Sequence, residues 1–93
     1  MRLLGRDKIE DFKRDNAGAR SALDKWAKIV EESNWLNFAD LKHKSPTTDY
    51  VKPFFIFNIG GNKYRLKAVV SFSLQQVNVL KIGTHADYEK WKL

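Results

Sequence analysis

A pair of consecutive glycines between two apolar runs constrains this chain more than any other feature. Gly60-Gly61 follows the apolar run Phe54–Ile59 and precedes residues 62–73, in which apolar and polar residues alternate. Two glycines in this setting are typical of a tight β-hairpin turn, because such turns need positive φ angles. A second turn at residues 74–76 leads into a third predicted strand over residues 77–83. The C-terminal half is therefore expected to form an antiparallel meander.

Two helices are predicted ahead of this meander. Between residues 7 and 15, Ile9 and Phe12 recur at helical spacing among charges, which indicates a short amphipathic helix. A break at residues 16–18 precedes a second predicted helix over residues 19–33. Its apolar residues form one stripe that is expected to pack on the core: Ala19, Ala22, Leu23, Trp26, Ile29 and Val30.

The remaining segments complete an α+β domain. Residues 1–4 are predicted to be a short strand or an extended lead-in, and residues 34–53 hold a turn of helix or a loop. Within the latter, residues 42–49 are interpreted as a surface loop, either a basic binding loop or, as we favour, a solvated connector. Thr84 and Asp87 have the spacing of a capping box, which predicts a final helix from His85 to about residue 91. Two helices packed on an antiparallel meander with a short C-terminal helix make a single α+β domain over residues 1–93.

Net charge narrows the kind of partner. The 93-residue chain has 17 Lys or Arg and 11 Asp or Glu, a formal net charge of +6. Such an excess on a small surface favours a polyanion or an acidic protein partner, although it can also serve solubility alone. The chain has no cysteine and no apolar run as long as a membrane span. We therefore expect a soluble, cytoplasmic protein with no membrane partner.

Alternation sorts the side chains of the meander onto two faces. Along residues 62–73, Lys63, Arg65 and Lys67 share one face. A two-residue turn at Gly60-Gly61 places Asn58 beside these cations. The opposite face is apolar and is expected to pack against the helices through Phe55, Phe57, Ile59, Tyr64, Leu66, Ala68, Val70 and Phe72.

The last predicted strand adds one more cation. Alternation points Val77, Val79 and Lys81 to one side, together with His85, and Lys81 is assigned to the charged face. His85 and Tyr88 are three residues apart, so they share a side of the final helix. A sheet face with cations, an aromatic ring and an imidazole suits a phosphate backbone with an unstacked base. The alternative is a charged face that is merely solvated, but the single sign of these charges favours a functional face.

The residue inventory limits the chemistry. His43 and His85 are the only histidines, and no carboxylate–histidine cluster has the spacing of metal ligands, so no metal or cofactor is expected. No nucleophile-elbow pattern is present either. RNA cleavage through the ribose 2′-hydroxyl needs no nucleophile from the protein, only a base, an acid and cations for the phosphate. Candidates for these catalytic roles are Arg65, Lys81, His85 and Tyr88.

Two segments carry a resemblance to a known family. The segment Phe57-Asn58-Ile59-Gly60-Gly61-Asn62-Lys63-Tyr64-Arg65-Leu66 and the segment Gly83-Thr84-His85-Ala86-Asp87-Tyr88 are similar to the signature segments of HigB-type toxins, which belong to the RelE-like toxins of type II toxin–antitoxin systems. The resemblance implies a RelE-like fold and ribosome-dependent endonucleolytic cleavage of mRNA. It also implies a HigA-like antitoxin with a helix-turn-helix region, so DNA is contacted only through the antitoxin complex.

The resemblance also implies site residues. The family's hairpin Asn and Arg correspond to Asn58, Asn62 and Arg65, its strand cation to Lys81, and its His and Tyr to His85 and Tyr88. Together with Lys63 and Lys67, the asparagines are expected to bind RNA. The sequence departs from the family at Glu89, where Asp is expected, and at Pro53, where a polar turn is expected.

Two other classes of function stay open on the sequence. A non-catalytic module that binds RNA or the ribosome needs only the basic face. The other class is a protein-interaction domain with an acidic partner. Its binding would depend little on salt concentration, and it would have no affinity for ribosomes.

Overall fold

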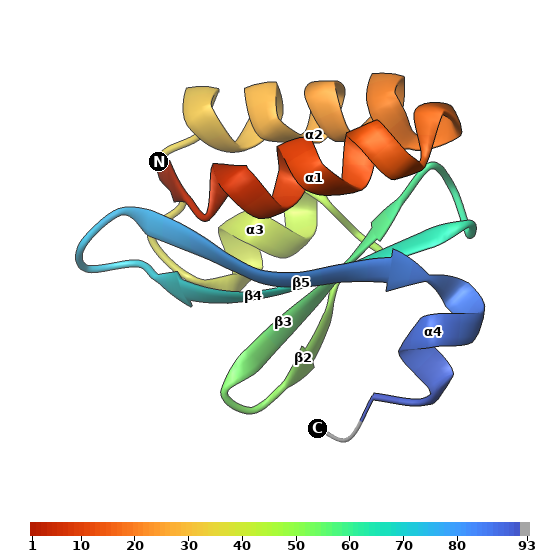
Figure 1. The fold of residues 1–93 in the computed structure, drawn as a ribbon. Helices are drawn as coiled ribbons and strands as arrows, with labels where there is room; N and C mark the ends of the chain where they lie inside the picture. The colour runs from red at the N-terminus through yellow and green to blue at the C-terminus, as the bar shows by residue number, and fades with distance from the viewer. Residues whose placement is uncertain (92–93) are drawn as a thin grey trace.

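The computed structural model describes residues 1–91, in which helices and strands form two layers (Figure 1). Helices α1 (Arg6–Asp15) and α2 (Arg20–Glu32) lie on one side of a five-stranded sheet. The shorter helix α3 (Phe38–Lys44) contributes Leu41 to the same core. The other elements are β1 (Arg2–Leu4), the 3₁₀ turn η1 (Ala17–Ala19), β2 (Asp49–Val51), β3 (Phe54–Ile59), β4 (Tyr64–Ser71), β5 (Gln76–Thr84) and α4 (His85–Glu89).

The predicted α+β architecture is confirmed, and the sheet holds two strands more than the predicted meander. Its strand order is β1-β5-β4-β3-β2, with antiparallel pairing from β2 to β5. β1 pairs with β5 in parallel, with Leu3 opposite Val77. The amino group of Met1 donates hydrogen bonds to the carbonyl oxygens of Val30, at 3.0 Å, and of Ser33. The N-terminal strand thus fastens the end of α2 to the edge of β5.

Both predicted N-terminal helices are confirmed with small shifts at their ends. α1 begins one residue early, at Arg6, and residues 17–19 form the turn η1 ahead of α2. Gly5 precedes α1 with a φ of 80°, and a Cβ atom there would collide with the carbonyl oxygen of Val79. Glycine therefore allows the start of α1 to approach β5 closely.

The interpretation of residues 42–49 as a surface loop is wrong at both ends. Lys42 to Lys44 form the last turn of α3, and Asp49 begins β2. Asn37 caps α3 by accepting a hydrogen bond at its Oδ1 atom from the Asp40 backbone N–H at 2.9 Å. Leu41 is fully buried and anchors the helix. A helix of seven residues is too short for its periodicity to be recognised in the sequence.

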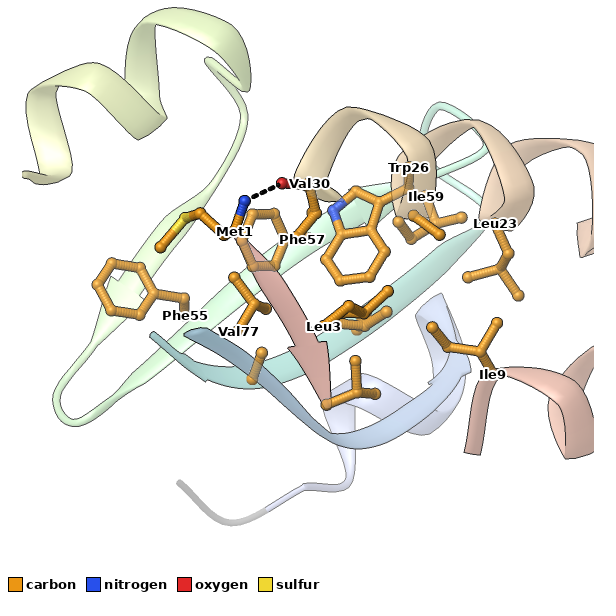
Figure 2. Packing of buried hydrophobic residues seen from close by; sticks show 14 of the residues in the cluster. Met1, Leu3, Ile9, Leu23, Trp26, Val30, Phe55, Phe57, Ile59 and Val77 are labelled. Atoms are coloured by element: carbon orange, nitrogen blue, oxygen red, sulfur yellow. Dashed lines mark hydrogen bonds between the residues drawn. The ribbon is translucent and has the colours of Figure 1, made fainter. Parts of the chain in front are cut away.

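The core lies between the helices and one face of the sheet (Figure 2). Trp26 of α2 packs edge-on against Phe57 of β3, with ring centroids 5.2 Å apart. Leu23 and Val30, on the same stripe of α2, are fully buried. The predicted core face of the meander is confirmed for its strand centres, because Phe57, Leu66 and Ala68 have no exposed surface. This packing covers one face of the sheet, so a binding site can form on the opposite face.

The turn between β3 and β4 has four residues, not two. Ile59 pairs with Tyr64, so Gly60, Gly61, Asn62 and Lys63 form the loop. Gly60 and Gly61 have φ angles of 64° and 70°, which explains the two glycines. The register of β3 against β4 moves by two residues, so the residues of these two strands lie on the predicted faces. Asn58 consequently lies opposite Arg65 instead of Lys63.

A β-bulge corrects the prediction for the last strand. Val77 and Val79 were expected to share a side with Lys81, but both valines are fully buried in the core. The register slips between Lys67 and Ala68: Lys67 pairs with Lys81, whereas Ala68 pairs with Val79. Because Leu80 is unpaired, the alternation of side chains changes there, and Lys81 lies on the opposite face from Val79. Lys81 therefore lies on the charged face as predicted, opposite Lys67, but the bulge and not strict alternation puts it there.

Candidate active site

The sheet face turned away from the helices collects the cations of the meander. In register terms it carries Asn58 on β3, Arg65 and Lys67 on β4, and Lys81 on β5. We call these four residues the cationic face. Helix α4 follows β5 directly and contacts β4 and β5. The cationic face is therefore bordered at one end by α4.

Arg65 is the most unusual of the four, because it is a buried charge. It is 7% exposed and is the only charged residue among the buried ones of residues 1–91. Its guanidinium donates to the Asn62 Oδ1 atom at 2.6 Å and to the Tyr64 carbonyl oxygen at 3.1 Å, and its Cζ atom lies 5.8 Å from the centre of the Tyr88 ring. No carboxylate within the described chain forms an ion pair with it. Burial of a charge without a counter-charge is costly, so this geometry is suited to an anionic ligand.

Lys67 and Lys81 are cross-strand neighbours with like charges, an arrangement that destabilises a sheet. Each ammonium group lies over a different aromatic ring. The Lys67 Nζ atom is 4.7 Å from the centre of the Phe54 ring, and the Lys81 Nζ atom is 5.2 Å from the centre of the Trp91 ring. The electron-rich ring faces stabilise the two cations without neutralising them.

Helix α4 is fixed in place by its start. The predicted capping box is confirmed: the Thr84 Oγ1 atom accepts from the Asp87 N–H at 3.1 Å, and the Asp87 carboxylate accepts from the Thr84 N–H at 3.0 Å. These hydrogen bonds, the backbone one first, hold the pKa of the Asp87 carboxyl below its usual range. The His85 N–H donates to the Lys63 carbonyl oxygen at 2.9 Å, which ties α4 to the β3–β4 turn. Tyr88 is thereby held over Arg65.

His85 lies at the edge of this arrangement. Its side chain is about half exposed, and its Nε2 atom is 3.2 Å from the Glu89 Oε1 atom, an ion pair when the imidazole is protonated. Glu89 is one of the two departures from the family pattern, and here its carboxylate contacts the candidate histidine. Among residues 1–91, the imidazole contacts Glu89, and its exposed half is accessible to solvent.

The structure brings together most of the residues predicted for the site. Arg65 contacts both Asn62 and Tyr88, and Asn58 is its strand neighbour. Lys63 was expected on the strand but lies in the turn, where its carbonyl oxygen anchors α4. Arg65 is the second residue of β4, close to this turn.

Sequence reasoning missed the two aromatic partners of the lysines. Phe54 shares the parity of Asn58 on β3, and Trp91 follows Tyr88 at helical spacing, so both signals were present in the sequence. The Trp91 ring packs edge-on against Tyr88, with centroids 5.6 Å apart. The cations of the cationic face are therefore accompanied by aromatic rings. Cations together with aromatic rings are the combination that binds single-stranded nucleic acid.

Two grooves flank the cationic face. One, of about 340 Å³, runs between α1 and β5 and includes Phe12, Leu80 and Lys81 in its lining. The other, of about 300 Å³, lies between α2 and the β3–β4 turn.

In the part of the chain that the structure describes, no three metal-ligating side chains gather at one point, and no helix has the length and apolarity to cross a membrane.

Comparison with known proteins agrees with the resemblance read from the sequence. Residues 19–91 match the family model described as HigB_toxin, RelE-like toxic component of a toxin-antitoxin system. A protein named mRNA interferase HigB from Escherichia coli O6:H1 is 23% identical over 93 residues, covering 97% of this chain and 90% of that relative. The mRNA interferase toxin HigB of Escherichia coli K12 is 35% identical over 52 residues, 53% of this chain and 50% of that relative. Each of the predicted site residues falls within the stretch that matches the family.

Proposed function

The chain belongs to the HigB family of RelE-like toxins, the toxic components of toxin–antitoxin systems, and we propose that it is an mRNA interferase that cuts mRNA on the ribosome. Two relatives that it resembles are named mRNA interferases. In our proposal the chain is an endoribonuclease that acts without a metal ion and stops translation in the cytoplasm.

The observation that carries the proposal is the buried guanidinium of Arg65, which forms no ion pair with a carboxylate of residues 1–91. Asn62 and the Tyr64 carbonyl hold it in place before any substrate binds. A guanidinium has five N–H donors in a rigid plane, so hydrogen bonds remain available for phosphate oxygens. A positioned charge of this kind stabilises the additional negative charge of a phosphate transition state at little reorganisation cost.

The chemistry follows from the neighbours of Arg65. Attack of a ribose 2′-hydroxyl on the adjacent phosphate forms a 2′,3′-cyclic phosphate and releases the 5′-oxygen, with one proton removed and one delivered. In our proposal Arg65 and Lys81 stabilise the phosphorane, His85 transfers a proton, and Tyr88 contacts an unstacked base. Asn58, Asn62, Lys63 and Lys67 bind the RNA around the scissile bond.

A toxin of this kind requires a partner that neutralises it. A toxin–antitoxin system implies an antitoxin, and we propose a HigA-like protein with a helix-turn-helix region. It would cover the cationic face with acidic side chains or a folded segment, and steering by opposite charges would make association fast and salt-sensitive. In this scheme DNA is contacted only through the complex with the antitoxin.

Controlled expression tests the proposal in cells. Expression of the chain alone should arrest growth, and co-expression of an antitoxin encoded next to it should restore growth. Normal growth at high expression of folded protein, in a host with compatible ribosomes, would remove the toxin function.

A purified translation system then separates cutting from mere binding. The expected result is cleavage of mRNA only when ribosomes are present. Growth arrest without mRNA cleavage would favour a non-catalytic ribosome-binding module. An absence of ribosome affinity, with binding that depends little on salt, would favour a protein-interaction domain.

A further inference from the structure

Trp91 contacts the end of α4, the ring of Tyr88 and the ammonium group of Lys81. It follows the end of α4, and its N–H donates to the Tyr88 carbonyl oxygen at 3.0 Å. Its ring packs edge-on against the Tyr88 ring and lies 5.2 Å from the Lys81 Nζ atom. Tyr88 in turn lies over Arg65, so these two adjoining rings cover one cation of β4 and one cation of β5.

The backbone of β5 is shaped for this ring. A Cβ atom at Gly83 would lie 2.9 Å from Trp91 Cζ2 and 2.9 Å from Asp87 Cβ, closer than atoms of packed side chains approach. Gly83 is also the strand partner of Arg65. Glycine at this position therefore lets Trp91 rest directly on β5, with the Lys81 ammonium group over its ring.

The position of the Lys81 ammonium group is not fixed by an ion pair within residues 1–91. Its neighbour on the sheet is Lys67, whose charge repels it, and no carboxylate within residues 1–91 forms an ion pair with either lysine. A free lysine side chain has four rotatable bonds and samples many conformations. The rings of Phe54 and Trp91 hold the two ammonium groups at separate places, so that each keeps its charge and a defined position.

We propose that Trp91 is a positioning residue that holds the Lys81 ammonium group where it meets the reacting phosphate. The inference rests on the proposed function of this face. It assigns Trp91 no contact with the reacting atoms: its effect on cleavage passes through Lys81. Loss of the ring should slow the chemical step more than it weakens ribosome binding, because the contact of Lys81 strengthens with the charge on the phosphate.

Single-turnover mRNA cleavage on saturating ribosomes tests this with a double-mutant cycle. Trp91→Leu should cut roughly tenfold more slowly, and Trp91→Phe, which keeps a ring, should retain most of the rate. In a Lys81→Ala background Trp91→Leu should cause no further loss, because the residue through which it acts is already absent. Tyr50→Leu is the matched control: it removes a half-exposed ring of β2, which contacts Phe38 and Phe55 and no cation of residues 1–91, and should leave the cleavage rate unchanged.

An NMR measurement on the free protein provides a readout that fold stability does not move. The Trp91 ring should shift the Lys81 Hε resonances upfield, and Trp91→Leu should abolish that shift while the thermal unfolding curve keeps its cooperativity. Losses that add in the double mutant, or Lys81 Hε resonances at ordinary positions in the wild type, would overturn the positioning role. A wild-type protein that cuts no mRNA would instead remove the proposed function and, with it, the phosphate role of Lys81.

Discussion

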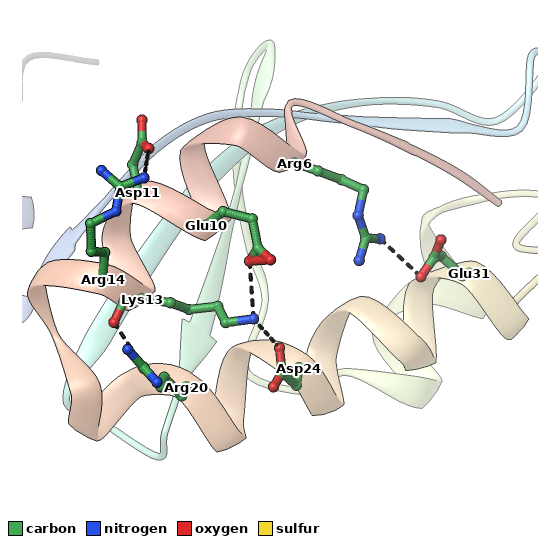
Figure 3. A network of polar contacts seen from close by, with 8 residues as sticks. All are labelled: Arg6, Glu10, Asp11, Lys13, Arg14, Arg20, Asp24 and Glu31. Carbon is green, nitrogen blue, oxygen red and sulfur yellow. Dashed lines mark hydrogen bonds and ion pairs between the residues drawn. The ribbon is translucent and has the colours of Figure 1, made fainter.

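Two charged surfaces of this molecule hold their cations in different ways. On the outer surface of α1 and α2, cations face carboxylates (Figure 3), and the shortest contact is 2.6 Å between Lys13 Nζ and Asp24 Oδ1. That hydrogen bond, with a second one to Glu10, raises the pKa of the Lys13 ammonium group. On the cationic face, Arg65, Lys67 and Lys81 lie over aromatic rings.

The difference decides what each surface can bind. A carboxylate cancels the charge of its partner, whereas a ring holds a cation and leaves its charge in place. Residues 1–33 contain eight basic and seven acidic residues, and residues 34–93 contain nine and four. The helical surface is therefore nearly balanced, and the cationic face keeps a positive field that attracts a polyanion.

The largest expected effect is at Arg65. Arg65→Ala should lower single-turnover mRNA cleavage on saturating ribosomes roughly a hundredfold or more, with ribosome binding retained, because a positioned donor to the transition state is lost. Arg14→Ala, which breaks the exposed pair with Asp11, is the matched control and should cut at the wild-type rate. If Arg65→Ala cuts at the wild-type rate as well, Arg65 serves docking alone, and the catalytic assignment passes to His85 and Lys81.

Lys67 should show a smaller effect of another kind. Lys67→Ala should weaken capture by ribosomes on the order of fivefold, with a milder loss of cleavage once ribosomes saturate the protein, because Lys67 acts by general attraction. Sedimentation with ribosomes at two salt concentrations measures this. Lys63→Glu and Lys67→Glu should weaken binding further, and unchanged binding of both ribosome and antitoxin would show that the wrong face was assigned.

The capping box of α4 should respond to acid. The pKa of Asp87 is lowered in the folded protein, so its contribution to stability is present above the unfolded pKa of about 3.9 and is lost as the pH falls through the lower folded value. The amide resonances of Thr84 and Asp87 should therefore titrate with a midpoint below about pH 3.9. Thr84→Ala should raise that midpoint, and a wild-type midpoint at or above the unfolded value would contradict the capping geometry.

The smallest effect is expected on the helical surface. Arg6 and Glu31 form a 3.0 Å ion pair with both side chains about half exposed. Glu31→Ala should reduce the free energy of unfolding by less than about 1 kcal/mol, since solvent screens such pairs. Calorimetry should find a Tm lower by no more than a few degrees, with unchanged cleavage. A large loss of activity would mean that the paired surface also takes part in function.

Much of the fold was predictable from local patterns. The two glycines, the stripe of α2 and the capping box at Thr84 each depend on neighbouring residues, and the structure confirms all three. The parallel pairing of β1 with β5 joins segments about 70 residues apart and leaves no local signal. The pattern of residues 34–53 predicts only a turn of helix or a loop, because the seven residues of α3 are too few to show a period.

The site shows the same division. Parity identified the faces of Asn58, Arg65 and Lys67, but the bulge at Leu80 broke the parity that had grouped Lys81 with two core valines. The burial of Arg65 is a tertiary property that spacing does not encode. For the two rings, spacing indicates the side on which Phe54 and Trp91 lie, and their contacts with the lysines are tertiary.

The salt dependence of RNA binding tests the central claim most directly: the cations over aromatic rings keep their charge for phosphate, and those paired with carboxylates do not. Affinity for a single-stranded RNA would be measured across salt concentrations for the wild type, Lys67→Ala, Lys81→Ala and Arg14→Ala. Each lysine variant should reduce the slope of log K against log salt by about 0.7, the value for one phosphate contact on a single strand, and Arg14→Ala should leave it unchanged. A slope that falls with Arg14→Ala and stays constant in both lysine variants would contradict the account.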